Sequence, residues 1–465
     1  MRIARAGTLG VVLVVLAAAC SGAEPGRGGP SVAPLEPYVP ANSGPVDEVT
    51  VDGIVAHLRA LQAIADANGG TRVAGSTGYD ASARYVADVL RATGYEVTLP
   101  STEVPVFEQD ATSVLVQIEP VRRRWVDGRD FRAMLFSASG AVRATVSHVD
   151  GGCTAADYAG FPSGDVALIQ STPECFRRLQ VVNAQQAGAV AVIGRSTAER
   201  GFPLRPTLVD PGAIAVPVLS VTAQAGRALV DGSVVRIRTR VSTSFDDVRS
   251  VVAELPDVEG DHVLMLGGHL DSVMDGPGLN DNGSGTALLL ETARWAAGLD
   301  PAPALRFAFW AGEEAGLYGS WAYAHALGTE ERERIDAYLN LDMVGSPNFV
   351  TFVYEASAGD PEMSRRVADR FEEALEELGA ASEPLDLHGA SDHAAFDDVG
   401  IATGGLYTGS QELKTPEQAE AYGGTAGEKL DPCYHQPCDT IDNVSEAALR
   451  LHASALVDVL ISLLG

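Results

Sequence analysis

Basic residues are scarce in this sequence, and the scarcity excludes several classes of partner. The 465 residues include 33 lysines and arginines against 62 aspartates and glutamates, which gives a formal net charge of -29 at pH 7. A charge of this sign repels nucleic-acid phosphates and anionic lipid headgroups. We therefore expect no nucleic-acid partner. The excess of carboxylates is compatible with export, with cation binding and with a substrate that has a cationic end.

Cysteine is scarce as well, and the sequence contains no repeat of the solenoid type. Five cysteines in 465 residues are too few for a disulfide-scaffold protein, and their spacing provides no four-ligand metal-thiolate cluster. Apolar residues make up 46% of the chain and charged residues 20%, which is ordinary for a folded α/β protein. The length is about three times the roughly 150 residues of one domain, so two domains are possible.

The N-terminus resembles an export signal. The apolar run over residues 8–19 follows two arginines and is shorter than the roughly 20 residues of a membrane-spanning helix. Residues 16–20 read Leu-Ala-Ala-Ala-Cys and resemble a bacterial lipobox, in which the cysteine is acylated. We expect a signal peptide over residues 1–19, a lipid on Cys20 and a location on the extracellular face of the membrane; a simple secretory signal is the alternative. The proline- and glycine-rich residues 20–47 indicate a disordered tether, so membrane contact is expected only through the anchor.

The rest of the chain divides into three segments. Residues 48–107 carry a helix, helix, strand pattern that is too small to bury its own faces. Between 108 and 247 short strands dominate, with one clear helix. From 248 to 465 short apolar strands alternate with helices, the pattern of a mainly parallel sheet covered on both faces. We predict an α/β fold in which the first and third segments form one domain and residues 108–247 form a smaller β-rich insert.

Apolar periodicity predicts the main elements of these segments. Helices are expected at about 49–68, 80–93, 176–187, 284–297, 316–327, 361–378 and 445–464. Strands are expected at about 95–99, 114–118, 166–169, 263–268, 305–310, 337–341, 349–354 and 401–406.

Metal-ligand residue types follow three of the predicted strands. They are His269 and Asp271, Glu313 and Glu314, and Asp342, with Asp281 just before a predicted helix. The ligand crevice of an open α/β sheet lies beyond the carboxyl ends of its strands. A single carboxylate after a strand is usually a turn or cap residue, but convergence of all of them on one edge favours a site.

Five motifs occur in order in the last segment. They are Gly-Gly-His-Leu-Asp-Ser-Val (267–273), Gly-Leu-Asn-Asp-Asn-Gly-Ser-Gly (278–285), Trp-Ala-Gly-Glu-Glu-Ala-Gly-Leu-Tyr-Gly-Ser (310–320), Asn-Leu-Asp-Met-Val-Gly (340–345) and Cys-Tyr-His-Gln-Pro-Cys-Asp-Thr (433–440). In these motifs the sequence resembles the bacterial form of the secreted double-zinc aminopeptidases of clan MH. The resemblance implies the zinc aminopeptidase fold and a peptidase that removes N-terminal residues from peptides or proteins.

The resemblance also implies two zinc ions per subunit. One would be held by His269, Asp281 and Asp342, and the other by Asp281, Glu314 and His435. A set of imidazoles and carboxylates without thiolates suits zinc. The competing histidine, His393, is expected to be a loop residue near the pocket.

Three further residues receive roles from the resemblance. Glu313 is expected to be the general base, with a supporting acid beside the ligands as the alternative. Tyr434 is expected to donate to the oxyanion, with a packing tyrosine as the alternative. Asp271 is expected to orient His269 by accepting its other ring N–H. A cis peptide bond between Asp281 and Asn282 is also implied.

The insert resembles a protease-associated domain, which would shape access to the cleft or act only as a spacer. Within it Cys153 and Cys175 can pair, and a Cys433–Cys438 bridge would pin the loop that presents His435 and Tyr434. This pairing leaves Cys20 for lipid. Ala390 stands where family members often carry an arginine, so any substrate contact of that arginine is in doubt.

Several alternatives stay open at this point. A carboxypeptidase or dipeptidase of the same clan would need cationic residues for the substrate carboxylate. A glutaminyl cyclase relative binds one metal, and receptor-like relatives lose the ligands that this sequence keeps. Phe352, Tyr354 and Tyr407 could line an apolar substrate pocket or belong to the sheet core. A monomer is favoured, and calcium and the natural substrate are not predicted.

Overall fold

The computed structural model describes residues 44–170, 175–195, 201–256, 258, 262–300 and 304–464. The predicted signal peptide, the predicted lipid on Cys20 and residues 20–43 of the predicted tether lie outside the described residues. The first described helix begins at Val51, close to the predicted start of the folded part.

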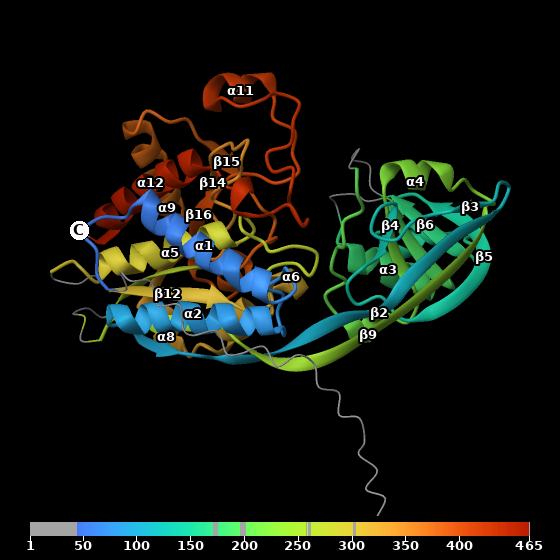
Figure 1. Cartoon of the computed structure of the whole chain (residues 1–465), viewed down its shortest axis with the longest axis horizontal. Coiled ribbons are helices and arrows are strands. Elements are labelled where there is room, and N and C mark those ends of the chain that lie inside the picture. Colours follow the sequence, from blue (N-terminus) through green and yellow to red (C-terminus); the bar gives the residue numbers. More distant parts are fainter. Residues whose placement is uncertain are drawn as a thin grey trace, which may run out of the picture. The chain divides into compact units, whose positions relative to one another are not determined.

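A mixed eight-stranded sheet lies at the centre of the main body, which is formed by residues 44–100 and 250–464 (Figure 1). Its strands are, in spatial order, β1 (Glu96–Thr98), β10 (Val251–Glu254), β12 (Leu305–Trp310), β11 (Val263–His269), β13 (Ile335–Leu341), β16 (Ala402–Tyr407), β14 (Phe352–Tyr354) and β15 (Glu383–Leu385). The neighbours β12, β11, β13 and β16 are parallel, whereas β10 and β14 are antiparallel to β12 and β16. The predicted mainly parallel sheet is confirmed.

Helices cover both faces of this sheet because alternate strand residues are apolar on both sides. On β11, Leu264 and Leu266 pack into one core cluster, and Val263 and Met265 into another. The first cluster includes α1 (Val51–Ala67), α2 (Thr77–Thr93), α5 (Gly283–Ala296), α9 (Pro361–Glu377) and α12 (Glu446–Leu464). The second includes α7 (Tyr318–Ala326) and α10 (His393–Asp398). The shorter helices α6 (Glu313–Gly316), α8 (Thr329–Arg334) and α11 (Pro416–Tyr422) complete the body.

Among the described residues, α12 is the one helix whose length and composition would allow it to cross a membrane. It packs instead against α9 and α1, and Leu449, Leu456 and Leu460 are fully buried in the core. We therefore assign α12 to the hydrophobic core.

The insert has its own eight-stranded sheet. Its strands are, in spatial order, β3 (Arg123–Arg124), β2 (Ser101–Glu119), β9 (Val234–Arg249), β5 (Gly140–Val149), β6 (Val166–Gln170), β7 (Ala191–Arg195), β8 (Val218–Val221) and β4 (Phe131–Ala133), with helices α3 (Arg177–Gln186) and α4 (Ala223–Ala228). The predicted disulfide between Cys153 and Cys175 is present.

Two long strands connect the insert to the main body. β2 and β9 pair antiparallel from Ser101 and Arg249 at one end to Glu119 and Val234 at the other, and Figure 1 shows them side by side. The predicted segment boundaries after residues 107 and 247 therefore fall inside paired strands.

Candidate metal centre

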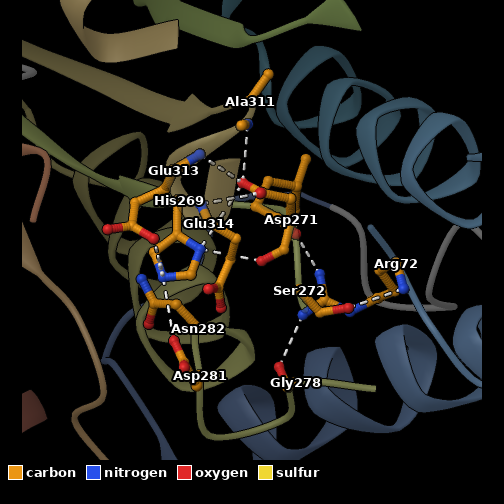
Figure 2. Close-up of polar contacts among 12 residues, drawn as sticks. Arg72, His269, Asp271, Ser272, Gly278, Asp281, Asn282, Ala311, Glu313 and Glu314 are labelled. Carbon is orange, nitrogen blue, oxygen red and sulfur yellow. Dashed lines mark hydrogen bonds and ion pairs between the residues drawn. The ribbon is translucent and has the colours of Figure 1, made fainter. Parts of the chain in front are cut away.

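The carboxyl ends of β11, β12 and β13 meet at one edge of the main sheet because the three strands are parallel. β11 ends in His269, and Asp342 directly follows β13. Glu313 and Glu314 open α6 shortly after β12, and Asp281 lies just before α5. Figure 2 shows the side chains of His269, Asp281 and Glu314 turned toward one another. The structure thus brings these predicted residues together.

The two glutamates lie in α6, a single helical turn that precedes the helix predicted at 316–327. Gly312 and Leu317 have left-handed backbone, with φ of 74° and 62°, and they isolate α6 as one turn before α7 begins. Because α6 is separate from α7, Glu313 and Glu314 stay beside the end of β12, and Figure 2 shows both next to His269.

The ligand atoms form two groups that share Asp281. In the first group, Nε2 of His269 lies 3.2 Å from Oδ1 of Asp281 and 3.4 Å from Oδ1 of Asp342. In the second group, Nε2 of His435 lies 3.0 Å from Oδ2 of Asp281 and 3.2 Å from Oε2 of Glu314. The two oxygens of one carboxylate therefore face two different histidine and carboxylate pairs.

These separations fit tetrahedral zinc. Zn–N and Zn–O bonds of about 2.0–2.1 Å place neighbouring ligand atoms about 3.3 Å apart. Oδ1 of Asp342 and Oε1 of Glu314 are also buried and have no hydrogen-bond partner. Since buried polar atoms are rarely left unpaired, these two oxygens favour a cation as the missing partner. The donor set present here can hold two such ions.

Negative charge is concentrated in this centre. Burial raises the pKa of Glu313 well above its usual range; His269 opposes this shift and Glu314 adds to it. Burial would also raise the pKa of Asp281, but hydrogen bonds with His269 and His435 outweigh it and lower that pKa. Several carboxylates thus surround two imidazoles, an excess of negative charge that divalent cations would compensate.

Asp271 holds the loop of the two glutamates. Its carboxylate accepts hydrogen bonds from the backbone N–H groups of Gly312 at 3.0 Å, Glu313 at 3.1 Å and Glu314 at 3.3 Å. Nδ1 of His269 lies 3.0 Å from the backbone oxygen of Asp271 and 3.8 Å from its carboxylate. The atom of Asp271 within hydrogen-bonding distance of the imidazole is therefore its carbonyl oxygen, while its carboxylate binds the loop.

Arg72 is a positioning residue that the sequence analysis missed. Its side chain is fully buried and donates to the backbone oxygens of Pro277 at 2.9 Å, Gly278 at 2.7 Å and Leu270. Burial lowers its pKa to about 10, and nearby Asp271 limits the fall, so the guanidinium stays charged at neutral pH. Figure 2 places Arg72 beside the loop between His269 and Asp281. The sequence signal nearest to it is the stretch Gly-Ser-Thr-Gly-Tyr at residues 75–79, which also resembles the family.

Asp439 holds the backbone of Asp281. Its two carboxylate oxygens accept from the backbone N–H groups of Asn280 at 2.9 Å and Asp281 at 3.1 Å. The Asp281–Asn282 peptide bond is cis, as the resemblance implied. Asp439 belongs to the last of the five motifs, and its position there was the signal that the sequence analysis left unused.

The loop of His435 is closed by the predicted disulfide between Cys433 and Cys438. The ring of Tyr434 stacks on that of His435, with centroids 3.8 Å apart and an angle of 20° between the planes. The structure therefore places Tyr434 next to the second ligand group.

His393 does not join the ligand groups. It begins α10 instead of lying in a loop, and its ring lies edge-on to Tyr354, with centroids 5.1 Å apart. Both residues line a separate cavity of about 480 Å³. The nearby Ser391 does reach the centre, because its hydroxyl donates to Oδ2 of Asp342 at 2.6 Å.

Contacts from the insert reach the loops of the centre. Nε of Arg205 donates to Asp275 at 3.0 Å, in the loop that Arg72 also holds. The hydroxyl of Thr207 donates to the backbone oxygen of Ala315, directly after Glu314, at 2.8 Å.

Comparisons with known proteins agree with this arrangement. A family model described as Peptidase family M28 matches residues 250–460, and one described as PA domain matches residues 142–229. The Aminopeptidase of Pseudomonas aeruginosa (strain UCBPP-PA14) is 37% identical to this chain over 94% of its residues and 85% of the relative. The chain belongs to peptidase family M28. The sequence-based prediction of a metallo-exopeptidase of this type with an inserted protease-associated domain is confirmed.

Two other relatives extend the family picture. The M28 chain is 34% identical to the Probable lipoprotein aminopeptidase LpqL of Mycobacterium tuberculosis over 88% of this chain and 84% of the relative. It is 29% identical to the Leucine aminopeptidase 2 of Trichophyton rubrum over 88% of this chain and 83% of the relative.

Solved structures share the fold of the M28 chain. The Aminopeptidase from Aneurinibacillus sp. strain AM-1 has a TM-score of 0.70 and 24% identity, covering 89% of this chain and 94% of the other. BSAP, a zinc aminopeptidase from Bacillus subtilis, also has a TM-score of 0.70 and 24% identity, covering 90% and 96%. At this identity the likeness concerns the fold, and it confirms the predicted fold class.

Proposed function

We propose that this M28 peptidase is a zinc-dependent aminopeptidase that uses two metal ions. The observation that carries the proposal is the orientation of Asp281, whose two carboxylate oxygens face two histidine and carboxylate pairs. His269 and Asp342 would hold one ion with it, and His435 and Glu314 the other. Zinc ions in such a pair act as Lewis acids toward a water molecule and the scissile carbonyl.

Glu313 would act as the general base. Oε2 of its carboxylate lies 4.0 Å from Nε2 of His269, so it stands beside the ligands without belonging to either group. Its side chain is 14% exposed and can reach a substrate in the crevice. It would accept the proton of the attacking water and transfer it to the leaving amine. The Asp271 carboxylate keeps the backbone of Glu313 in place for both steps.

Tyr434 would stabilise the oxyanion. It stacks on His435, and a neutral hydroxyl beside the second ion can donate to the negative oxygen that develops on the carbonyl.

An aminopeptidase is favoured over a carboxypeptidase by charge. The excess carboxylates of the centre suit a free α-ammonium, whereas Ala390 offers no cation for a substrate carboxylate. The names of the relatives, Aminopeptidase and Leucine aminopeptidase 2, support the same reading. We therefore propose peptide or protein N-termini as substrates.

We also propose an exported lipoprotein, acylated at Cys20. The lipobox-like residues 16–20 support this, as does the description of the relative LpqL as a probable lipoprotein. Labelling with a radioactive fatty acid, with and without Cys20→Ser, would test the proposal.

Hydrolysis of a panel of aminoacyl chromogenic amides tests the activity. Amides with a free N-terminus should be hydrolysed, and N-acetylated amides should not. Chelation of the metal should abolish hydrolysis, and added zinc should restore it. Equal cleavage of blocked substrates, or cleavage only of peptides with a free carboxyl end, would exclude the aminopeptidase.

A further inference from the structure

The insert differs from the rest of the chain in charge. Residues 108–247 hold 15 of the 33 basic residues, all of them arginines, and 14 of the 62 acidic residues, so their net charge is +1. The remaining residues therefore carry -30. A whole-chain charge of -29 hides this asymmetry.

Three of the insert's arginines line one side of β9. Arg236, Arg238 and Arg240 are exposed, whereas Ile237 and Thr239 between them are buried. Successive side chains of a strand point to opposite faces of a sheet. The insert's apolar core therefore lies under one face of β9, and the arginines stand on the other.

Neighbouring strands extend this row. Arg143 of β5 lies directly opposite Arg236, and Arg124 of β3 lies opposite Val116, which itself pairs with Arg236. Strands are about 4.8 Å apart, so Arg124, Arg143 and Arg236 stand in one line across four strands. We call this surface the arginine face; it consists of Arg124, Arg143, Arg236, Arg238 and Arg240.

The arginine face contains a shallow cavity of about 420 Å³. Arg124, Arg143, Arg236 and Arg238 line it, and no carboxylate does. Its arginines are exposed, which suits an extended anionic surface better than a small enclosed anion. No aromatic side chain lines it, although stacking platforms are the usual means of binding single-stranded nucleic acid.

The acidic remainder of the chain does not cancel this local charge. Screening at physiological salt reduces interactions between exposed charges beyond about 8 Å. The field just above the arginine face is therefore set mainly by its five guanidinium groups and by the exposed Glu119, which pairs with Val234 two residues before Arg236. Each arginine near the surface of an anionic bilayer raises the binding constant about fivefold.

We propose that the arginine face binds anionic phospholipid headgroups and lays the insert on the membrane surface. The predicted lipid on Cys20 would keep the protein near that membrane, and the face would then orient it. Membrane contact would thus not be limited to the anchor, as the whole-chain charge suggested.

Vesicle binding tests this proposal. The unit Pro37–Gly465 is compact by itself, so it can be used without the predicted leader and lipid. It should sediment with vesicles of phosphatidylcholine that contain about 30% phosphatidylglycerol, and not with pure phosphatidylcholine. Binding should disappear when the salt is raised to about 1 M.

Matched variants distinguish binding through the arginine face from a general effect of net charge. The pair Arg236→Gln and Arg238→Gln should weaken binding by about 30-fold. The pair Arg365→Gln and Arg366→Gln removes the same charge from exposed positions on α9 and should leave binding within about twofold. Both should cleave a soluble aminoacyl amide like the parent chain.

Three results would overturn the proposal. Equal losses in the two variant pairs would assign any binding to net charge. Binding to soluble polyglutamate without binding to vesicles would assign the face to an acidic protein partner. A salt-sensitive dimer that the Arg236→Gln and Arg238→Gln pair dissolves, again without vesicle binding, would assign it to a second copy of the chain.

Discussion

Replacing Arg72 by methionine should destabilise the fold and the metal centre together. Methionine fills a similar volume but leaves the carbonyl oxygens of Leu270, Pro277 and Gly278 without their donor. A buried acceptor left unpaired costs about 1–3 kcal/mol. Partial relaxation of the loop will recover some of this, so we expect a loss of about 3–6 kcal/mol. Such a loss is a large part of the roughly 5–15 kcal/mol that stabilises a typical domain.

Urea unfolding with all metal chelated measures this loss without linkage to zinc binding. Arg84→Met on the exposed side of α2 is the matched control and should change the free energy of unfolding by less than about 0.5 kcal/mol. Arg72→Lys keeps the charge but not the planar fork, so its loss should be intermediate. Zinc affinity should fall by roughly tenfold or more in Arg72→Met, because the loop joins two ligands. A loss below about 1 kcal/mol with normal zinc affinity would refute the reasoning.

Three further changes address individual residues. Glu313→Gln should keep the zinc but lower turnover of an aminoacyl amide by about 10²–10⁴-fold, and near-normal turnover would remove Glu313 from its role. His435→Ala should reduce the zinc content by one ion per chain, while His393→Ala should leave it unchanged. The opposite result would assign the ligand role to His393 instead of His435. Joint replacement of Cys433 and Cys438 by serine should weaken zinc affinity in a chelator competition, and unchanged affinity would show that the loop holds without the bridge.

The place of the candidate site could be predicted from local pattern, whereas the choice of ligands, including His435, rested on the resemblance of the five motifs. Apolar runs identify strands, and the ends of parallel strands fall on one edge of the sheet. His269 and Asp342 therefore follow from the strand assignment, and the structure places both at that edge. The pairing of Cys433 with Cys438 likewise needed only their short separation.

The supporting residues could not be predicted in this way. Arg72 binds a loop about 200 positions further along the chain, and Asp439 binds backbone groups almost 160 positions before it. Both contacts exist only once the main body has folded. No periodicity in either segment points to such a partner, although a buried arginine and a buried aspartate each require one.

The extent of β2 was underestimated for another reason. Its pairing with β9 shifts register near Glu108, Ala111 and Gln117, and such irregularities interrupt the alternation that reveals a strand. The sequence pattern therefore indicated only the regular stretch at 114–118. The arginine face was missed although Arg236, Arg238 and Arg240 alternate regularly. The sequence does not show which strands lie beside β9, and it is this pairing that adds Arg143 to the row.

The zinc content of the purified chain tests the central claim most directly. Metal analysis after dialysis should give two zinc ions per chain, and Asp281→Ala should lose both, because one carboxylate serves both ligand groups. Exchange of the exposed Asp336 for alanine should change nothing. A parent chain with one zinc ion, or an Asp281→Ala variant that still holds two, would contradict a bridged pair of metals.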